Sequence, residues 1–155
     1  MTGRHDRSVF ESASAPLDDW LRRTAQQHQQ RGISKTFVAI SDDEPTRILG
    51  YYALTACEVL TGHLPQDLAR KLPRKVPGIR LGRLAVDRTV QGQGLGEHLL
   101  MDALDRSRRV LEHIGIHALF VDAKDERAAS FYLKYGFRPL PQDALTLVLP
   151  LARLP

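Results

Sequence analysis

The chain has 155 residues, 43% of them hydrophobic, and a net charge of +4, which indicates one globular domain rather than a disordered chain. Its only cysteine, Cys57, excludes a disulfide within the chain and a zinc site of clustered cysteines, and no histidine spacing matches a metal motif, so we expect no metal. No apolar run approaches the roughly 20 residues of a membrane helix, and the polar start lacks a signal peptide, so we expect a cytoplasmic protein without membrane contact.

The first third of the chain predicts a helix followed by a β-hairpin. Residues 1–13 show no periodic pattern and are expected to be flexible or weakly ordered. Apolar residues at helical spacing then predict one helix over 16–31, ended by Gly32 as a left-handed cap. Segments 35–41 and 47–59 are rich in β-branched and aromatic residues and flank a turn, so they predict the two strands of a hairpin.

The middle of the chain predicts a short helix, a strand and a long helix. The short helix is expected over 64–72, and Pro73 and Pro77 are expected to interrupt regular structure after it. Residues 79–86 are apolar at several successive positions, as in a strand covered on both faces. An apolar stripe at helical spacing predicts a long helix over 94–114, with Ile114 as the last residue of the stripe.

The last part of the chain completes an α/β pattern. It predicts a strand over 116–122, a helix over 126–135 capped by Gly136, a final strand or strands over 137–149, and an end of pairing at Pro150. The strand–helix–strand unit from 79 to 122 predicts a right-handed parallel crossover. The predicted fold class is therefore α/β, a single domain over 1–155 with a mixed central sheet flanked by helices.

The junction between the third strand and the long helix carries the main chemical signal. It reads Gln91-Gly92-Gln93-Gly94-Leu95-Gly96 and leads straight into the helix. Such a turn presents free backbone N–H groups at the positive end of the helix dipole, and glycine lets a phosphate approach the backbone. The turn predicts a diphosphate ligand; the alternative is a tight strand-to-helix turn without a ligand.

A second signal is a basic segment before that strand. Positions 70 to 83 contain six basic residues and no acidic one: Arg70, Lys71, Arg74, Lys75, Arg80 and Arg83. This segment suits a polyanion, either a nucleic acid or the phosphates of a cofactor. It equally suits a solvated loop that keeps the protein soluble, so charge alone leaves both interpretations open.

Three motifs together resemble the GNAT acetyltransferase superfamily over about residues 16 to 149. They are Leu84-Ala85-Val86-Asp87, Gln91-x-x-Gly94-x-Gly96 and Asp125-x-x-Ala128-x-x-Phe131-Tyr132-x-x-x-Gly136-Phe137. The resemblance implies an N-acetyltransferase that uses acetyl-CoA as co-substrate, with the glycine turn on its pyrophosphate. It also implies that the strands at 79–86 and 116–122 splay apart and that the pantetheine arm hydrogen-bonds along one of them.

The resemblance assigns roles to individual residues. It places coenzyme A contacts at Leu84, Ala85, Val86, Gln91, Gly92, Gln93, Gly94, Leu95, Gly96, Asp125, Ala128 and Phe131. Leu84 and Val86 would act through their backbone, and a backbone N–H near Ala85 would bind the thioester oxygen. Tyr132 would donate a proton to the leaving thiolate, with Tyr135 as the competing neighbour.

A closer resemblance is to the tRNA-acetylating toxins of bacterial toxin–antitoxin pairs. The residues that carry it are Leu17-Asp18-x-Trp20-Leu21, Ser34-x-Thr36-Phe37-Val38, Gly50-Tyr51-Tyr52-x-Leu54, Leu72-Pro73, Ile79-x-Leu81-Gly82-Arg83-Leu84-Ala85-Val86-Asp87 and the Phe131-Tyr132 block. It implies acetylation of the α-amino group of aminoacyl-tRNA, a block of translation, a ribbon–helix–helix antitoxin and a homodimer. The sequence departs from the pattern at Asp125, where many members have Asn, and at 12–14, where members often carry Cys-Gly.

The basic segment gains a function from this resemblance, because it enters the strand that would hold acetyl-CoA. Arg74, Lys75, Arg80 and Arg83 are therefore predicted to contact tRNA phosphates, although Arg83 could instead pair with an acid. No general base is assigned among Glu58, Asp87, His98 and Cys57. An α-amino group has an intrinsic pKa of about 7.7–8.0, and esterification of the amino acid to tRNA is expected to lower that pKa further. A dedicated base is therefore not required.

Three other functions fit parts of the sequence. The chain could be a GNAT enzyme that acetylates a small amine or a protein amino group, although the acceptor-side segment 70–83 is basic rather than acidic. It could be a nucleic-acid-binding module without catalysis, which would leave the glycine turn without a purpose. It could also be a coenzyme A-binding module that has lost activity, against which the presence of Tyr132 argues.

Overall fold

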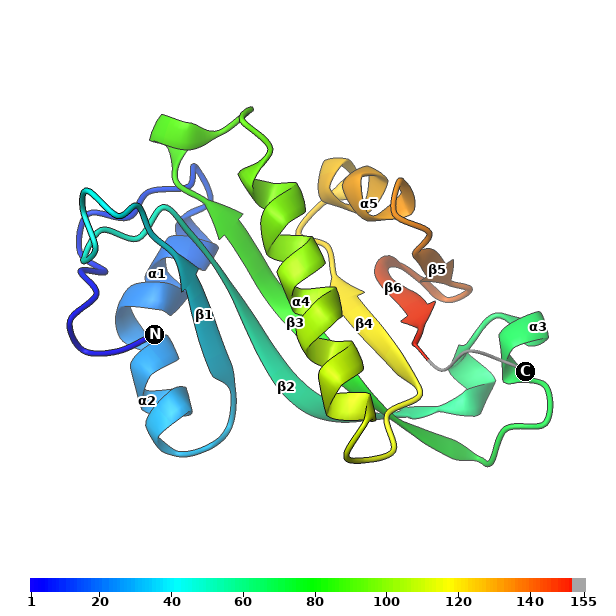
Figure 1. Ribbon diagram of the computed structural model, residues 1–155. Helices are drawn as coiled ribbons and strands as arrows, with labels where there is room; N and C mark the ends of the chain where they lie inside the picture. Colours follow the sequence, from blue (N-terminus) through cyan, green and yellow to red (C-terminus); the bar gives the residue numbers. More distant parts are fainter. Residues whose placement is uncertain (152–155) are drawn as a thin grey trace. The chain divides into compact units, whose positions relative to one another are not determined.

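The fold was analysed in a computed structural model that describes residues 1–151. The described residues form a six-stranded mixed sheet with the strand order β1-β2-β3-β4-β6-β5, together with flanking helices (Figure 1). They group into two compact units, the first of Met1–Thr55 and Arg83–Ala103 and the second of Ala56–Gly82 and the described residues from Leu104 onward. Within residues 1–151 no helix is both long and apolar enough to cross a membrane.

The first unit contains the predicted N-terminal helix and the hairpin. The helical segment is two helices, α1 (Ala15–Arg23) and α2 (Ala25–Gln30), rather than the single helix that the periodicity predicted. The chain breaks at Thr24, whose φ of −120° is outside the helical range. Gly32 follows α2 with a φ of +70°, which confirms the predicted left-handed cap.

The hairpin consists of β1 (Lys35–Ala39) and β2 (Gly50–Leu60). The two strands pair antiparallel from Lys35 with Leu54 to Ala39 with Gly50, which confirms the prediction. Within the first unit α2 contacts β1, and both helices lie beside that strand in Figure 1.

Aromatic residues form the core of the first unit. The rings of Trp20 and Tyr51 are stacked with centroids 6.1 Å apart, and Phe10 meets Tyr51 edge-on at 5.6 Å. Phe10 belongs to the segment that was expected to be weakly ordered, yet only 1% of its surface is exposed. The N-terminal ammonium of Met1 also donates a hydrogen bond to the carbonyl of Thr36 at 2.8 Å. Residues 1–13 thus lack regular structure but contribute to the core.

The second unit contains the parallel pair and the C-terminal strands. β3 (Lys75–Val86) pairs parallel with β4 (Ala118–Asp122), as the crossover pattern predicted. α5 (Glu126–Leu133) contacts β6 (Asp143–Pro150), and β6 pairs antiparallel with both β4 and the short β5 (Arg138–Leu140). The short helix expected over 64–72 is a 3₁₀ turn, η1 (Thr61–His63), followed by α3 (Gln66–Ala69).

The prediction that Pro77 interrupts regular structure is wrong. β3 begins at Lys75 and includes Pro77, because the strand uses the carbonyl of Pro77, which accepts a hydrogen bond from the N–H of His117 at 2.9 Å. The paired register of β6 ends at Pro150, as predicted, with Pro150 opposite Ala118 and the N–H of Leu151 bonded to the carbonyl of His117 at 2.9 Å. Proline removes a donor but keeps an acceptor, so it is tolerated where its N–H is not needed.

The long helix, α4 (Leu95–Leu111), is shorter than the stripe predicted. After Leu111 the N–H groups of Glu112 and His113 bond three residues back, to Arg109 and Val110, in tighter 3₁₀-like turns. Ile114, expected to face the core, is 61% exposed. The helix therefore loses its periodicity before the stripe ends.

We predict that Gly78→Ala destabilises the second unit. A Cβ at Gly78 would lie 2.6 Å from Cε2 of Phe120 and 3.0 Å from the carbonyl oxygen of Ala118, both of which are buried. The expected loss in urea denaturation is about 1–3 kcal/mol, as for other overpacked cores. Gly62→Ala is the matched control, since a Cβ there meets no atom within 4 Å. Equal losses in the two variants would contradict the steric account.

Candidate functional site

The glycine turn of the first unit lies between β3 and α4. After Val86 the chain passes through a 3₁₀ turn, η2 (Arg88–Val90), and reaches α4 at Leu95. Gly92 and Gly94 have φ values of +78° and +84°, in the left-handed region that side chains with a Cβ rarely adopt. A Cβ at either glycine would meet no protein atom within 4 Å, so the space above the turn is open.

The start of α4 adds hydrogen-bond donors to this open turn. The first bond of the helix runs from the N–H of His98 to the carbonyl of Gly94 at 3.2 Å. The N–H groups of Leu95, Gly96 and Glu97 therefore have no acceptor within the helix, as at any helix N-terminus. These donors, the helix dipole and two left-handed glycines with free space above them fit a diphosphate.

Gln91 holds the turn rather than projecting from it. Its amide nitrogen donates to the carbonyl of Val86 at 2.9 Å and to the carbonyl of Ser12 at 2.8 Å. The side chain thereby ties the turn to the end of β3 and to the N-terminal segment. Both donors of the amide have protein acceptors, so the side chain acts here by positioning the backbone of the turn.

Asp87 is an anchor that sequence reasoning considered only as a possible base. It is 4% exposed and accepts hydrogen bonds from the N–H of Glu11 at 3.0 Å and from the hydroxyl of Thr89 at 2.6 Å. Burial raises the pKa of Asp87, but the bonds from Thr89 and Glu11 outweigh it, and the pKa lies below its usual range. Asp followed two residues later by Thr is the local signal that predicts such a turn.

The strand segment Leu84 to Val86 forms the outer strand of the first unit, beside β2. Ala85 is buried, and its carbonyl would lie 3.1 Å from a Cβ at Gly50 of β2. The register of β3 with β4 runs from Gly78 to Leu81 and does not reach Leu84. Backbone groups along an outer strand are available to an extended ligand, which fits the predicted pantetheine contacts.

The second unit brings together the residues predicted on α5. Asp125 caps the helix by accepting the N–H of Ala128 at 2.8 Å. Tyr132 is 4% exposed, and its ring meets those of Phe131 at 5.2 Å and Phe137 at 5.7 Å. Burial and then the charge of Asp122 raise the pKa of Tyr132 well above its usual value, so the phenol keeps its proton at neutral pH.

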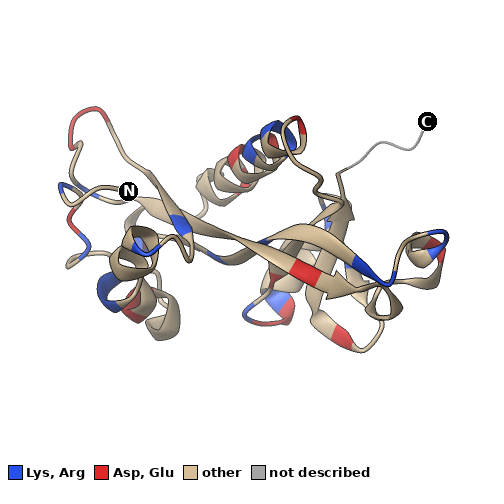
Figure 2. Cartoon of the chain, turned by 90° about the horizontal axis from the view of Figure 1, so that it is seen from below, with Lys and Arg blue, Asp and Glu red and all other residues tan. Residues whose placement is uncertain are grey.

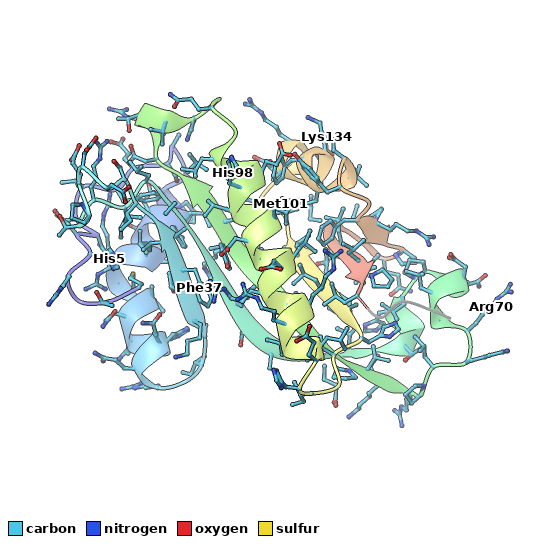
Figure 3. The ribbon with its side chains drawn as sticks, viewed as in Figure 1. His5, Phe37, Arg70, His98, Met101 and Lys134 are labelled. Carbon is cyan, nitrogen blue, oxygen red and sulfur yellow. The ribbon has the colours of Figure 1, made fainter. Side chains whose placement is uncertain are left out.

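The four predicted tRNA-binding residues differ in their surroundings. Arg80 makes an ion pair with Asp122 at 2.6 Å, and Arg83 lies over the ring of Trp20, 4.4 Å from its centroid. Arg74 and Lys75 are exposed at the start of β3, where Lys and Arg gather on the segment leading from α3 (Figure 2). Arg70, on the same segment, extends away from α3 (Figure 3).

The candidate bases lack the features of one. His98 is exposed on the first turns of α4 (Figure 3), and Glu58 pairs with Lys75 at 3.5 Å on the surface. Burial raises the pKa of the Cys57 thiol despite the neighbouring Arg80. Within residues 1–151 no group of three or more His, Cys, Asp or Glu side chains is arranged to hold a metal ion.

Comparison with known proteins identifies the family. A profile of the acetyltransferase (GNAT) domain matches residues 32–139, and a tRNA-acetylating toxin of Mycobacterium tuberculosis is 40% identical over 144 residues, 93% of this chain and 85% of the toxin. The chain belongs to the GNAT acetyltransferase family.

Solved structures of related acetyltransferases agree in fold. The structure of AtaT complexed with acetyl-methionyl-tRNAfMet has a TM-score of 0.89 and 30% identity, over 96% of this chain and 89% of that one. A mutant AtaT toxin bound to the C-terminus of the antitoxin AtaR and acetyl-CoA has a TM-score of 0.82 and 28% identity, over 95% of this chain and 86% of that one.

We predict that Gly94→Glu abolishes stabilisation of this acetyltransferase by acetyl-CoA. The glutamate would place a side chain and a negative charge in the open space above the turn, where the diphosphate is expected. Acetyl-CoA binding only the folded state raises the melting temperature of the parent, and this shift should vanish in the variant. Gly32→Glu is the control, because Gly32 has a similar φ of +70° and equally open space away from the turn. An undiminished shift in Gly94→Glu would refute the assignment.

Proposed function

We propose that this acetyltransferase transfers the acetyl group of acetyl-CoA to the α-amino group of aminoacyl-tRNA and acts as a toxin that blocks translation. The observation that carries the proposal is the 40% identity, over 93% of this chain, to a tRNA-acetylating toxin. The complex of AtaT with acetyl-methionyl-tRNAfMet supports the same acceptor.

The residues of the first unit would bind and orient the co-substrate. The turn Gln91–Gly96 and the first N–H groups of α4 would hold the diphosphate, and the backbone of Leu84 and Val86 would align the pantetheine arm. A backbone N–H near Ala85 would stabilise the charge that develops on the thioester oxygen. Acetyl-CoA supplies the activated acetyl group when bound.

Tyr132 of the second unit would supply the proton for the thiolate. A bond forms between the neutral acceptor nitrogen and the acetyl carbon, the carbon–sulfur bond breaks, and the sulfur takes the phenolic proton. The nitrogen loses one proton to solvent as the amide forms, and the phenolate of Tyr132 regains one from solvent. The raised pKa of Tyr132 keeps the phenol protonated but also makes it a weaker acid. Proton donation is therefore expected during, not before, departure of the thiolate.

We further propose that an antitoxin of the ribbon–helix–helix class neutralises the enzyme and that the enzyme is a homodimer in the cytoplasm. The complex of AtaT with the antitoxin AtaR supports an antitoxin partner. Its class and the dimer follow from the family resemblance of the sequence.

The direct test incubates the enzyme with labelled acetyl-CoA and charged tRNA. Label is expected in acid-precipitable tRNA and, after mild base, on the released N-acetyl amino acid. Uncharged tRNA is the control, since it has no α-amino group. Labelling of small amines or protein alone would assign the enzyme to the other acceptor class.

We predict that Tyr132→Phe lowers kcat for charged tRNA by about 10²-fold or more, the typical effect of removing a positioned acid. Phenylalanine keeps the ring contacts with Phe131 and Phe137, so the acetyl-CoA melting shift should persist. Tyr135→Phe is the matched control and should retain activity. The opposite pattern, with only Tyr135→Phe inactive, would move the role to Tyr135.

We predict that replacing Arg74 and Lys75 by Glu weakens acetylation of charged tRNA and flattens its salt dependence. Each lost phosphate contact should lower the slope of log K against log salt by about 0.7–0.9. The acetyl-CoA melting shift should be unchanged. Replacing Arg108 and Arg109, two exposed basic residues of α4, by Glu controls for net charge. An equal loss in both double variants would show that no local tRNA contact is involved.

A further inference from the structure

The second unit contains a pocket of about 570 Å³, and Arg80 is the residue of its lining already predicted to bind tRNA. The end of β2 and η1 supply Glu58, Leu60 and His63, and β3 supplies Arg80. The β5–β6 turn supplies Gln142, and β6 supplies Asp143 and Thr146. Its volume lies in the range of small-molecule sites and exceeds any single amino-acid side chain. The pocket therefore has room for a larger group than the side chain of an aminoacyl moiety.

The charges of the lining favour a hydrogen-bond donor over a phosphate as the occupant. Asp143 accepts hydrogen bonds from the hydroxyl of Thr146 at 2.6 Å and from the N–H of Leu145 at 3.1 Å, which hold the pKa of this carboxyl below its usual range. Glu58 adds a second carboxylate. The lining also contains His63 and Arg80, and the guanidinium of Arg80 is already bound to Asp122 at 2.6 Å. The pocket thus offers acceptor oxygens to a neutral or cationic donor.

Apolar side chains complete the lining. Val59, Leu60 and Leu140 face the same pocket as the two carboxylates. A nucleoside has the matching chemistry: flat apolar faces on the base, N–H donors on its edge and hydroxyl donors on the ribose. Protein sites for unpaired nucleosides combine contacts to the faces of the base with hydrogen bonds to its edge and to the 2′-hydroxyl.

The basic segment borders this pocket. Thr61, between Leu60 and His63, donates its N–H to the carbonyl of Arg74 at 2.8 Å and its hydroxyl to the carbonyl of Pro73. Lys75 lies 3.5 Å from the carboxylate of Glu58. Positive groups at the rim and carboxylates inside suit the end of a nucleic-acid strand. Its phosphates would remain outside the pocket, and its last nucleoside would enter the pocket.

The pocket is also linked to the proposed acid through one wall. Arg80 binds Asp122, the last residue of β4, and the charge of Asp122 acts on Tyr132. One ion pair therefore connects the wall of the pocket to the carboxylate whose charge acts on the phenol of Tyr132.

We propose that this pocket binds the terminal adenosine of the aminoacyl-tRNA, with the preceding phosphates on Arg74 and Lys75. The proposal rests on the function proposed above and names the part of the acceptor that the second unit recognises. Glu58 and Asp143 accept hydrogen bonds from the base edge or the ribose, and the leucines contact the base.

The test uses a minimal acceptor, the stable 3′-aminoacylamino analogue of adenosine, beside the matching amino-acid amide, which lacks the nucleoside. Glu58→Gln removes one exposed carboxylate, and Gln142→Trp fills the pocket from its exposed turn. Each should raise KM for the analogue by about tenfold or more, as when a hydrogen bond to a charged group is lost, with no change for the amide. Glu112→Gln, an exposed carboxylate outside the lining, should match the parent.

Two kinetic outcomes would overturn the proposal. Parental KM for the analogue in both variants would show that no nucleoside binds there. An equal rise for the analogue and the amide would show that the pocket reads the amino acid instead.

A binding measurement keeps the two proposals separable. Unreactive adenosine is titrated into the isotope-labelled parent, and saturable NMR shifts are expected at the amides of Leu60, Gln142 and Thr146. No shift at millimolar adenosine would overturn the pocket assignment even if charged tRNA is acetylated. Saturable shifts in an enzyme that acetylates neither tRNA nor the analogue would retain the nucleoside site and refute the tRNA function.

Discussion

The buried carboxylate of Asp87 is the interaction on which the first unit depends. It receives the N–H of Glu11, 76 residues earlier in the chain, and both the N–H and the hydroxyl of Thr89, and it lies 3.6 Å from the guanidinium of Arg47. The N–H of Asp87 itself bonds to the carbonyl of Leu49 at 2.8 Å. One residue thus joins the N-terminal segment, the hairpin and the loop before the glycine turn. Loss of these partners together would leave a buried charge without compensation.

The glycine turn needs this support because its conformation is uncommon. Two residues with positive φ lie within three positions, and the exposed turn gains little from core packing. Gln91 contributes the second support through its bonds to Val86 and Ser12. The residues that hold the turn are therefore distinct from the N–H groups that would meet the diphosphate, and such a second layer of contacts is what keeps a binding geometry fixed.

Basic residues in the segment 70–83 are divided between internal partners and solvent. Arg80 and Arg83 have an ion pair and an aromatic ring as partners, so their charges are partly used within the protein. Arg74 and Lys75 are exposed, and within residues 1–151 Lys75 has an ion pair, with the exposed Glu58, whereas Arg74 has none. Exposed pairs of this kind contribute little to stability, so these two side chains can exchange protein contacts for phosphates at small cost.

The sequence by itself determined the features that depend on local chemistry. Helical and strand periodicities located the hairpin, β4, α4 and α5. The predicted left-handed caps at Gly32 and Gly136 are confirmed by φ values of +70° and +91°. Motif spacing was sufficient to indicate the GNAT family, since its glycine turn and α5 block are each short and contiguous.

Only the tertiary structure decided what depends on distant partners. Pro77 and Pro150 lie in strands because the N–H of His117 donates to the carbonyl of Pro77 and its carbonyl accepts the N–H of Leu151. Asp87 is an anchor because Glu11 and Arg47 reach it. The pocket of the second unit likewise combines residues from positions 58 to 146. Local propensity does not predict such contacts, because their free energy arises only when segments far apart in the chain pack together.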